Sequence, residues 1–181
     1  MAWSTPLTAV ANASLTAAQW NASVRDNLLM TAPAVATTAG MIIGITGSNS
    51  IAQRVPDAQQ QLTGETTTST TYTGTLSGGA GSAGPSVTQA CTRALISFSC
   101  RQSTSIATTN VWTSVAVSGA STIAASDNYA TSMDILNAQI FHGLSYIEKG
   151  MTQGNNTFQM QYRVSGGTGT FATRRLNVVP F

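Results

Sequence analysis

The stretch NTFQMQYRVSGG, residues 156–167, decides the fold of this chain. Its apolar side chains alternate strictly with polar ones. Successive side chains of a β-strand point to opposite faces, so the alternation is typical of a strand with one buried and one solvated face. The Gly-Gly pair that follows indicates a turn. In this strand we therefore expect a core made by Phe158, Met160, Tyr162 and Val164.

Segments on both sides of this strand extend the β pattern. In ACTRALISFSC, residues 90–100, the side chains of Ile96 and Phe98 fall on one face and are further core candidates. About eight strands separated by turns at regular intervals are typical of a sandwich or barrel, and a jelly roll is the most natural arrangement at that number. The sequence therefore predicts a mostly β protein with an antiparallel, jelly-roll-like β-sandwich over residues 65–181. The other strand-forming runs are residues 65–76, 110–119, 120–126, 137–150 and 169–181.

A single helical pattern lies near the N-terminus, in SLTAAQWNASVRDNLL, residues 14–29. Thr16 and Gln19 have the spacing of a capping box, and the pattern predicts a helix over about residues 16–30. The apolar residues recur every four positions and form a thin stripe. A helix of this length is marginal alone in water, so it must pack on its own β domain or on a partner chain. The stripe consists of Trp20, Val24 and Leu28.

The segment after the helix predicts a small hairpin. Short apolar patches at residues 41–46 and 50–54, joined by a Gly-Ser-Asn turn, indicate two strands that carry Ile42 and Ile43. A two-stranded hairpin is not independently stable and needs a neighbouring surface. The polar run that follows lacks a β pattern and is interpreted as a linker. The predicted organisation is an arm over residues 1–56, a linker over residues 57–64 and the sandwich over residues 65–181.

Composition limits the classes of function. Only 8% of the residues are charged, against a usual share of about 25%, and such surfaces suit a protein that packs into a large assembly. The eight basic and six acidic residues give a net charge of +2 and are scattered along the sequence, so nucleic acid is not expected as a partner. No apolar run approaches the roughly 20 residues that span a bilayer, and the N-terminus lacks a signal-peptide pattern. Cys91 and Cys100 are interpreted as buried free thiols of a protein made in the cytoplasm.

The sequence offers no credible catalytic, cofactor or metal site. His142 is the only histidine, and a hydrogen-bonded strand histidine is the favoured interpretation over a metal ligand or a triad member. Asp127 and Asp134 flank a loop and could act as a carboxylate pair or bind Ca²⁺, but acidic residues that cap turns are commoner. The glycines of GGAGSAGP, residues 78–85, spell a dinucleotide fingerprint without the helix that should follow it.

Two adjacent arginines near the C-terminus predict opposite environments. Neighbouring residues of a strand face opposite sides, so Arg174 and Arg175 are expected to point away from each other. An ion contact between strands or subunits is favoured over a ligand site.

Two segments resemble a known class of proteins. WNASVRDNLLMTAPAVATTAGMIIGITGSNSIAQR, residues 20–54, is similar to the N-terminal arms of virion surface and tail-associated proteins of tailed bacteriophages that infect actinobacteria. FQMQYRVSGGTGTFATRRLNVVPF, residues 158–181, resembles the closing strands of the β domain that accompanies those arms. The resemblance implies a non-enzymatic virion protein with an attachment arm and a trimeric, jelly-roll-like head.

The expected function is that of a homotrimeric capsid decoration protein on the virion surface, anchored by its arm to the major capsid protein or another virion protein. The alternative is a tail or fibre-tip recognition module that binds host surface glycans. Receptor-binding tips often present clusters of aromatic residues on loops. Here Trp112 and Tyr146 lie in strand patterns and Tyr129 alone lies in a clear loop, which favours decoration. No enzyme activity, cofactor, membrane or nucleic acid is expected. The residues assigned to attachment or arm packing are Trp20, Val24, Leu28, Ile42 and Ile43.

Overall fold

The computed structural model describes the chain except for residues 1–13, 15, 30, 32–34, 48–49 and 78–82. It divides into two compact units, Met1–Val55 with Phe181, and Pro56–Pro180.

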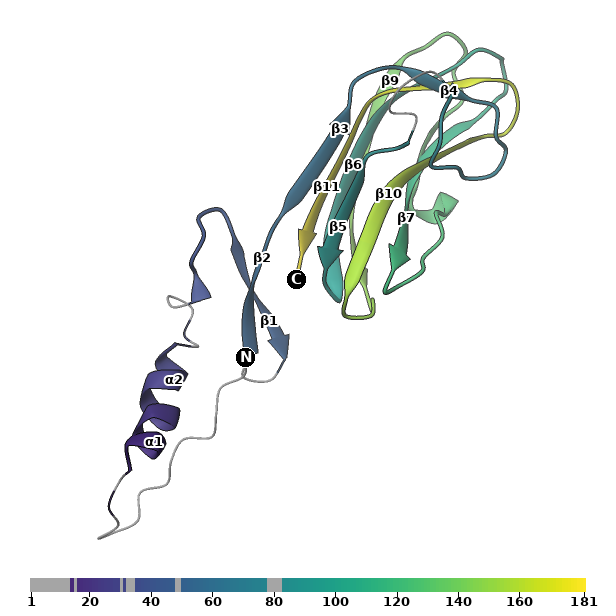
Figure 1. Ribbon diagram of the computed structural model, residues 1–181. Helices are drawn as coiled ribbons and strands as arrows, with labels where there is room; N and C mark the ends of the chain where they lie inside the picture. Colours follow the sequence, from purple (N-terminus) through teal and green to yellow (C-terminus); the bar gives the residue numbers. More distant parts are fainter. Residues whose placement is uncertain (1–13, 15, 30, 32–34, 48–49, 78–82) are drawn as a thin grey trace. The chain divides into compact units, whose positions relative to one another are not determined.

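The first unit contains the predicted helix in three parts: α1 (Ala17–Trp20), a π-helical turn (Asn21–Arg25) and α2 (Asp26–Leu28) (Figure 1). The capping box is confirmed, because the Gln19 backbone N–H donates to the Thr16 hydroxyl at 3.2 Å and the Thr16 N–H donates to the Gln19 side chain at 2.9 Å. The π-turn was not expected. Its hydrogen bonds span five residues instead of four, and it lies between Trp20 and Leu28.

The predicted hairpin is also present in this unit. Strands β1 (Ile42–Gly47) and β2 (Ser50–Arg54) pair antiparallel, with Ile43 opposite Gln53 and an irregularity between Ile45 and Gly47. Within the described residues the unit has no other sheet.

The linker predicted over residues 57–64 is wrong in its first half. Residues Asp57–Gln61 form strand β3, which pairs antiparallel with the last strand, β11 (Gly169–Pro180), and places Gln60 opposite Arg175. The strand lies at a sheet edge, and four of its five side chains are exposed. An edge strand gains its stability from backbone hydrogen bonds to one neighbour, so it does not require the apolar alternation by which strands are recognised.

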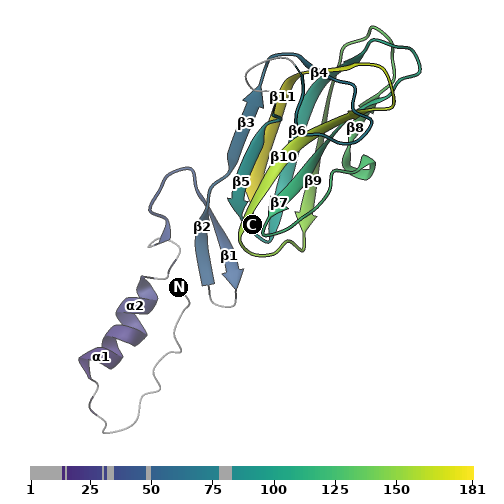
Figure 2. The ribbon, with the colours of Figure 1, turned by 45° about the vertical axis from the view of Figure 1, so that its right-hand side comes forward.

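The second unit is an antiparallel sandwich of two sheets (Figure 2). One sheet has the order β3-β11-β6-β9, with β4 also paired to β11, and the other has the order β5-β10-β7-β8. A short 3₁₀ helix, Asp127–Tyr129, precedes β8. The strands are β4 (Glu65–Thr67), β5 (Ser86–Ala90), β6 (Arg93–Thr104), β7 (Val111–Gly119), β8 (Thr131–Met133), β9 (Ile140–Lys149) and β10 (Asn155–Val164), followed by β11.

The strand pairing is nested. Strand β4 pairs with β11, β5 with β10, β6 with β9 and β7 with β8. Successive pairs alternate between the two sheets, which is the arrangement of a hairpin of eight strands wrapped into a double-sheet jelly roll. The predicted fold class, mostly β with one short helix, a hairpin and a jelly-roll-like sandwich, is confirmed.

The core lies between the two sheets. The side chains expected there from β6 and β10 are buried, and the rings of Tyr162 and Phe171 pack with their centroids 4.8 Å apart. Cys91 precedes β6 and Cys100 lies on it, and both are buried cysteines that form no disulfide. Burial raises the pKa of the Cys100 thiol to about 12. The buried residues from the predicted core are Ile96, Phe98, Phe158, Met160, Tyr162 and Val164.

Candidate interaction surfaces

The helix of the first unit presents large apolar side chains to solvent. Trp20 is 54% exposed and Leu28 is 59% exposed, whereas Val24 is half-buried within the π-turn. Leu29, beyond the predicted stripe, is exposed as well. The three residues of the predicted stripe therefore differ in exposure: Val24, in the π-turn, is half-buried, whereas Trp20 and Leu28 on either side of it are exposed.

The hairpin of the same unit has little burial of its own. Ile42 is exposed and Ile43 is half-buried, while Ile45 is 81% exposed. Among the described residues of this unit, the one fully buried side chain is polar: Asn27, whose amide donates to the Ser23 carbonyl at 3.0 Å. The unit therefore lacks an apolar core in its described part, and its exposed apolar side chains are available to a partner.

A second surface is the outer face of the sheet β3-β11-β6-β9. Side chains of β6 alternate between buried and solvent-facing positions, and the register shows which residues of β9 and β11 share its outer face. On this face Ser97 lies beside Ser145, with their hydroxyls 2.8 Å apart. The centre of the face consists of small polar groups, and Leu95 lies between Ile147 and Val179 in a short apolar row toward one end.

Four cations lie on this same face. Arg93 is directly opposite Lys149, and Arg175 is opposite Ser99, two residues before Arg101. The scatter of charges along the sequence thus becomes a cluster in the fold, because strands distant in sequence share one face. No described residue forms an ion pair with any of the four, and the outward positions of these strands carry no carboxylate. Beside Arg175 lies a pocket of about 310 Å³ lined by Ala58, Gln59, Gln60, Arg175 and Asn177.

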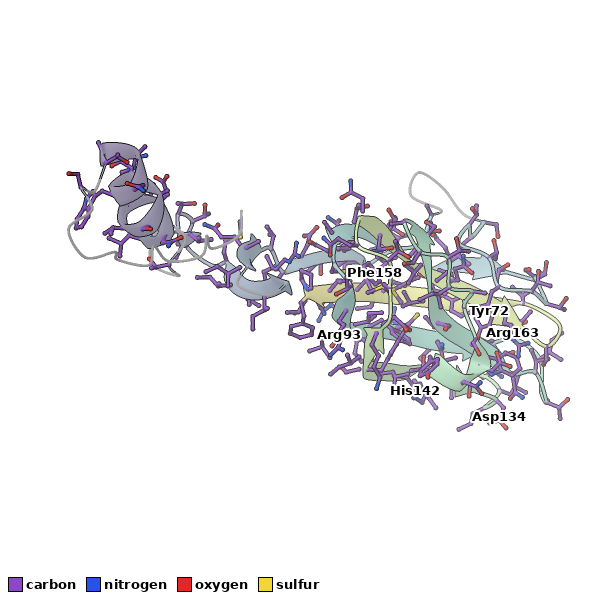
Figure 3. All side chains as sticks on the ribbon, turned by 90° about the horizontal axis from the view of Figure 1, so that it is seen from below. Tyr72, Arg93, Asp134, His142, Phe158 and Arg163 are labelled. Carbon is purple, nitrogen blue, oxygen red and sulfur yellow. The ribbon has the colours of Figure 1, made fainter. Side chains whose placement is uncertain are left out.

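A third cluster lies on the outer face of the other sheet. The Arg163 guanidinium stands 3.7 Å from the centroid of the Trp112 ring and forms an ion pair with Asp127. The Tyr72 hydroxyl donates to the same carboxylate at 2.8 Å. These groups satisfy one another, and they hold the loop of Tyr72 and the 3₁₀ helix of Asp127 against the sheet. Figure 3 shows Tyr72 and Arg163 toward the same end of the β domain, and Arg93 toward the opposite end.

The geometry gives Asp127 a structural role. The hydrogen bonds from Arg163 lower the pKa of the Asp127 carboxyl, so it stays ionised and paired rather than exchanging a proton near neutral pH. Asp134 lies just after β8 and is exposed. No group of three or more His, Cys, Asp or Glu side chains that could hold a metal ion occurs among the described residues.

His142 and the glycine motif also take structural positions. His142 lies on β9, half-buried, but the expectation of a hydrogen-bonded histidine is wrong for Nε2, which is buried and lacks a partner in the described structure. The opening glycines of GGAGSAGP, residues 78–82, lie outside the described residues. Gly84 donates its N–H to the Gly74 carbonyl at 2.7 Å, and the chain continues into β5 rather than a helix.

The ion contact between strands that was expected for the arginine pair exists at Arg174, but its burial and its partner were not foreseen. Arg174 and Arg175 face opposite sides, as predicted, with Arg174 fully buried and Arg175 exposed. The Arg174 guanidinium lies 2.6 Å from the Glu65 carboxylate on β4. A bulge between Ala172 and Arg175, with Thr173 at φ 49°, directs Arg174 inward.

Among the described helices, none has the length and apolar character needed to span a bilayer.

These features define the class of the chain: a jelly-roll β domain with an N-terminal helix-and-hairpin arm. No family model matches the sequence, and no curated protein matches it. Among solved structures, the chain is similar to the VP2 subviral particle of infectious bursal disease virus, with a TM-score of 0.44 and 14% identity over 77% of this chain. The match spans 38% of that protein. It is a distant likeness to a viral particle protein, and the jelly-roll assignment rests on the strand order alone.

Proposed function

We propose that this chain is a homotrimeric decoration protein of a bacteriophage capsid, anchored by its arm and displaying its β domain on the virion surface. The observation that carries the proposal is the exposure of large apolar side chains on an arm without an apolar core in its described part. Exposing Trp20, Leu28 and Ile45 to water is unfavourable, and burial of apolar area on a partner removes that cost. The resemblance of residues 20–54 to virion attachment arms supports the same assignment.

Deleting residues 1–55 tests the anchor. The truncated protein should keep the β-rich circular dichroism spectrum of the jelly roll, because its core lies between the two sheets. It should be absent from purified virions when particle proteins are quantified by mass spectrometry. Full occupancy of the particle by the truncated protein would show that the arm is not the anchor.

A second candidate function is recognition of host surface glycans by the β domain. It is favoured by the polar outer face of the sheet β3-β11-β6-β9, whose serine and amide side chains match the hydrogen-bonding groups of sugars. Purified full-length protein should then bind a glycan array or immobilised host cell-wall polysaccharide, which a purely decorative head would not do.

A further inference from the structure

We propose that the outer face of the sheet β3-β11-β6-β9 binds an acidic, carboxylate-bearing polysaccharide. This inference rests on the second candidate function and names its surface and ligand chemistry. The first observation is charge. Four of the chain's eight basic residues lie on this face, without an ion pair among the described residues. Like charges placed opposite each other in a sheet are unfavourable, as for Arg93 and Lys149, and an anionic ligand offsets that repulsion.

The second observation is the arrangement of the cations. Arg93 and Lys149 form one pair, and Arg101 and Arg175 form another. Along β6 the two groups are roughly 26 Å apart, from eight residues at about 3.3 Å each. A single small anion cannot reach both groups, whereas an extended chain with repeating charges can. The planar guanidinium of arginine matches the two oxygens of a carboxylate.

The third observation distinguishes a polysaccharide from a protein partner. Protein interfaces have an apolar, desolvated centre and a polar rim. Here the order is reversed, because Ser97, Ser99 and Ser145 occupy the centre and the apolar row lies toward one end. Hydroxyl and amide groups at the centre can bond to sugar hydroxyls. The pocket beside Arg175 adds the amides of Gln60 and Asn177 to that surface.

A nucleic acid would use the same cations but needs different neighbours. Single strands bind by stacking their bases on aromatic side chains in a basic groove. Phe141, opposite Arg101, is the one aromatic side chain at the outward positions of the described strands of this sheet. The face therefore favours a polyanion with few stacking groups and many hydroxyls.

The test uses full-length protein with three probes: oligogalacturonate longer than the cation span, neutral dextran of equal length, and single-stranded DNA of equal charge. Lys149 is the chain's only lysine, so its acetylation rate, followed by mass spectrometry, reports directly on the surface. Oligogalacturonate should bind at low ionic strength by calorimetry and slow the acetylation of Lys149, and dextran should do neither. The substitution R101Q/R175Q should weaken binding about tenfold with an unchanged thermal midpoint.

The matched control is S86E/S118E. It changes the net charge by the same amount on exposed positions of the other sheet and should leave binding within about twofold. Equal weakening by the control, or DNA binding as tight as that of oligogalacturonate, would overturn the proposal. Failure of every glycan to bind would remove the recognition function as well. Glycan binding that ignores R101Q/R175Q would preserve recognition and place it elsewhere.

Discussion

Arg174 and Arg175 show how adjacent residues take opposite roles in one strand. The strand period predicts that they face opposite sides, and they do. Their partners could not be predicted. The pairing of Arg174 with Glu65 crosses 109 positions of sequence and depends on a bulge, and single-sequence patterns indicate neither a bulge nor which strands become neighbours.

The buried pair predicts a specific asymmetry in stability. Replacing Glu65 by Gln should lower the free energy of unfolding by about 3–5 kcal/mol, because it leaves the Arg174 charge buried without its counter-ion. Replacing both residues, in E65L/R174M, should recover most of that loss, since the desolvation cost is removed together with the attraction. Urea denaturation of the three proteins measures the difference. Equal destabilisation by the single and double changes would contradict this account.

Asp127 predicts a weak dependence of stability on acid. Its folded pKa is lowered by hydrogen bonds from Arg163, so its contribution is fully present above the ordinary carboxyl pKa of 3.8 and is lost as pH falls through the lower folded value. The carboxylate is half exposed, so solvent screening keeps the effect below about 1 kcal/mol. The thermal midpoint of D127N should therefore fall less than that of the wild type between pH 5 and pH 2. Parallel curves for the two proteins would rule out this contribution.

A strand could be recognised from the sequence only where burial of one face imposes an alternation of apolar and polar residues. The long strands β6 and β10 are buried on one face, and their alternation marked them. Strand β3 is exposed at an edge and carries no such mark, so residues 57–61 were interpreted as a linker. The cation cluster was missed for a related reason: the strand order, which brings Arg175, Arg101 and Lys149 to one face, cannot be deduced from separate segments.

A single substitution in the helix, at Trp20, is expected to weaken attachment to the particle strongly. Trp20 can bury roughly 200 Å² on a partner, and removing a well-buried Trp costs about 3–5 kcal/mol. If the helix faces the particle, Trp20→Ala should weaken attachment by about two to three and a half orders of magnitude, measured as occupancy of purified virions.

The control for this substitution is Asn21→Ala, next to Trp20 and outside the stripe, which should change occupancy little. The thermal midpoint of the β domain should be the same in all three proteins. A lower midpoint in Trp20→Ala with normal attachment would show that the helix packs on its own β domain.

At the scale of the whole molecule, the number of strands was enough to suggest a jelly roll. The number of strands does not define their order, whereas the nested pairing shows which pairs of strands belong to which sheet. The jelly roll has an apolar core of its own between its sheets, so the need for association comes from surfaces outside that core. They include the exposed apolar side chains of the arm and, on the β domain, exposed apolar side chains such as Phe141 and Ile147 and a face of cations without an ion pair among the described residues.

The whole molecule is expected to form a homotrimer. A closed ring buries the same surface on every copy without leaving a free end, and the exposed Ile45 of the hairpin offers such a surface, whereas Trp20 and Leu28 are assigned to the particle. A two-fold contact that sets the basic face against itself is disfavoured, because it would bring Arg93 and Lys149 of both copies together. Light scattering on purified full-length protein should give the mass of three chains of 18.7 kDa, and deletion of residues 1–55 should lower the stability of that trimer. A monodisperse monomer at micromolar concentration would refute the threefold assembly.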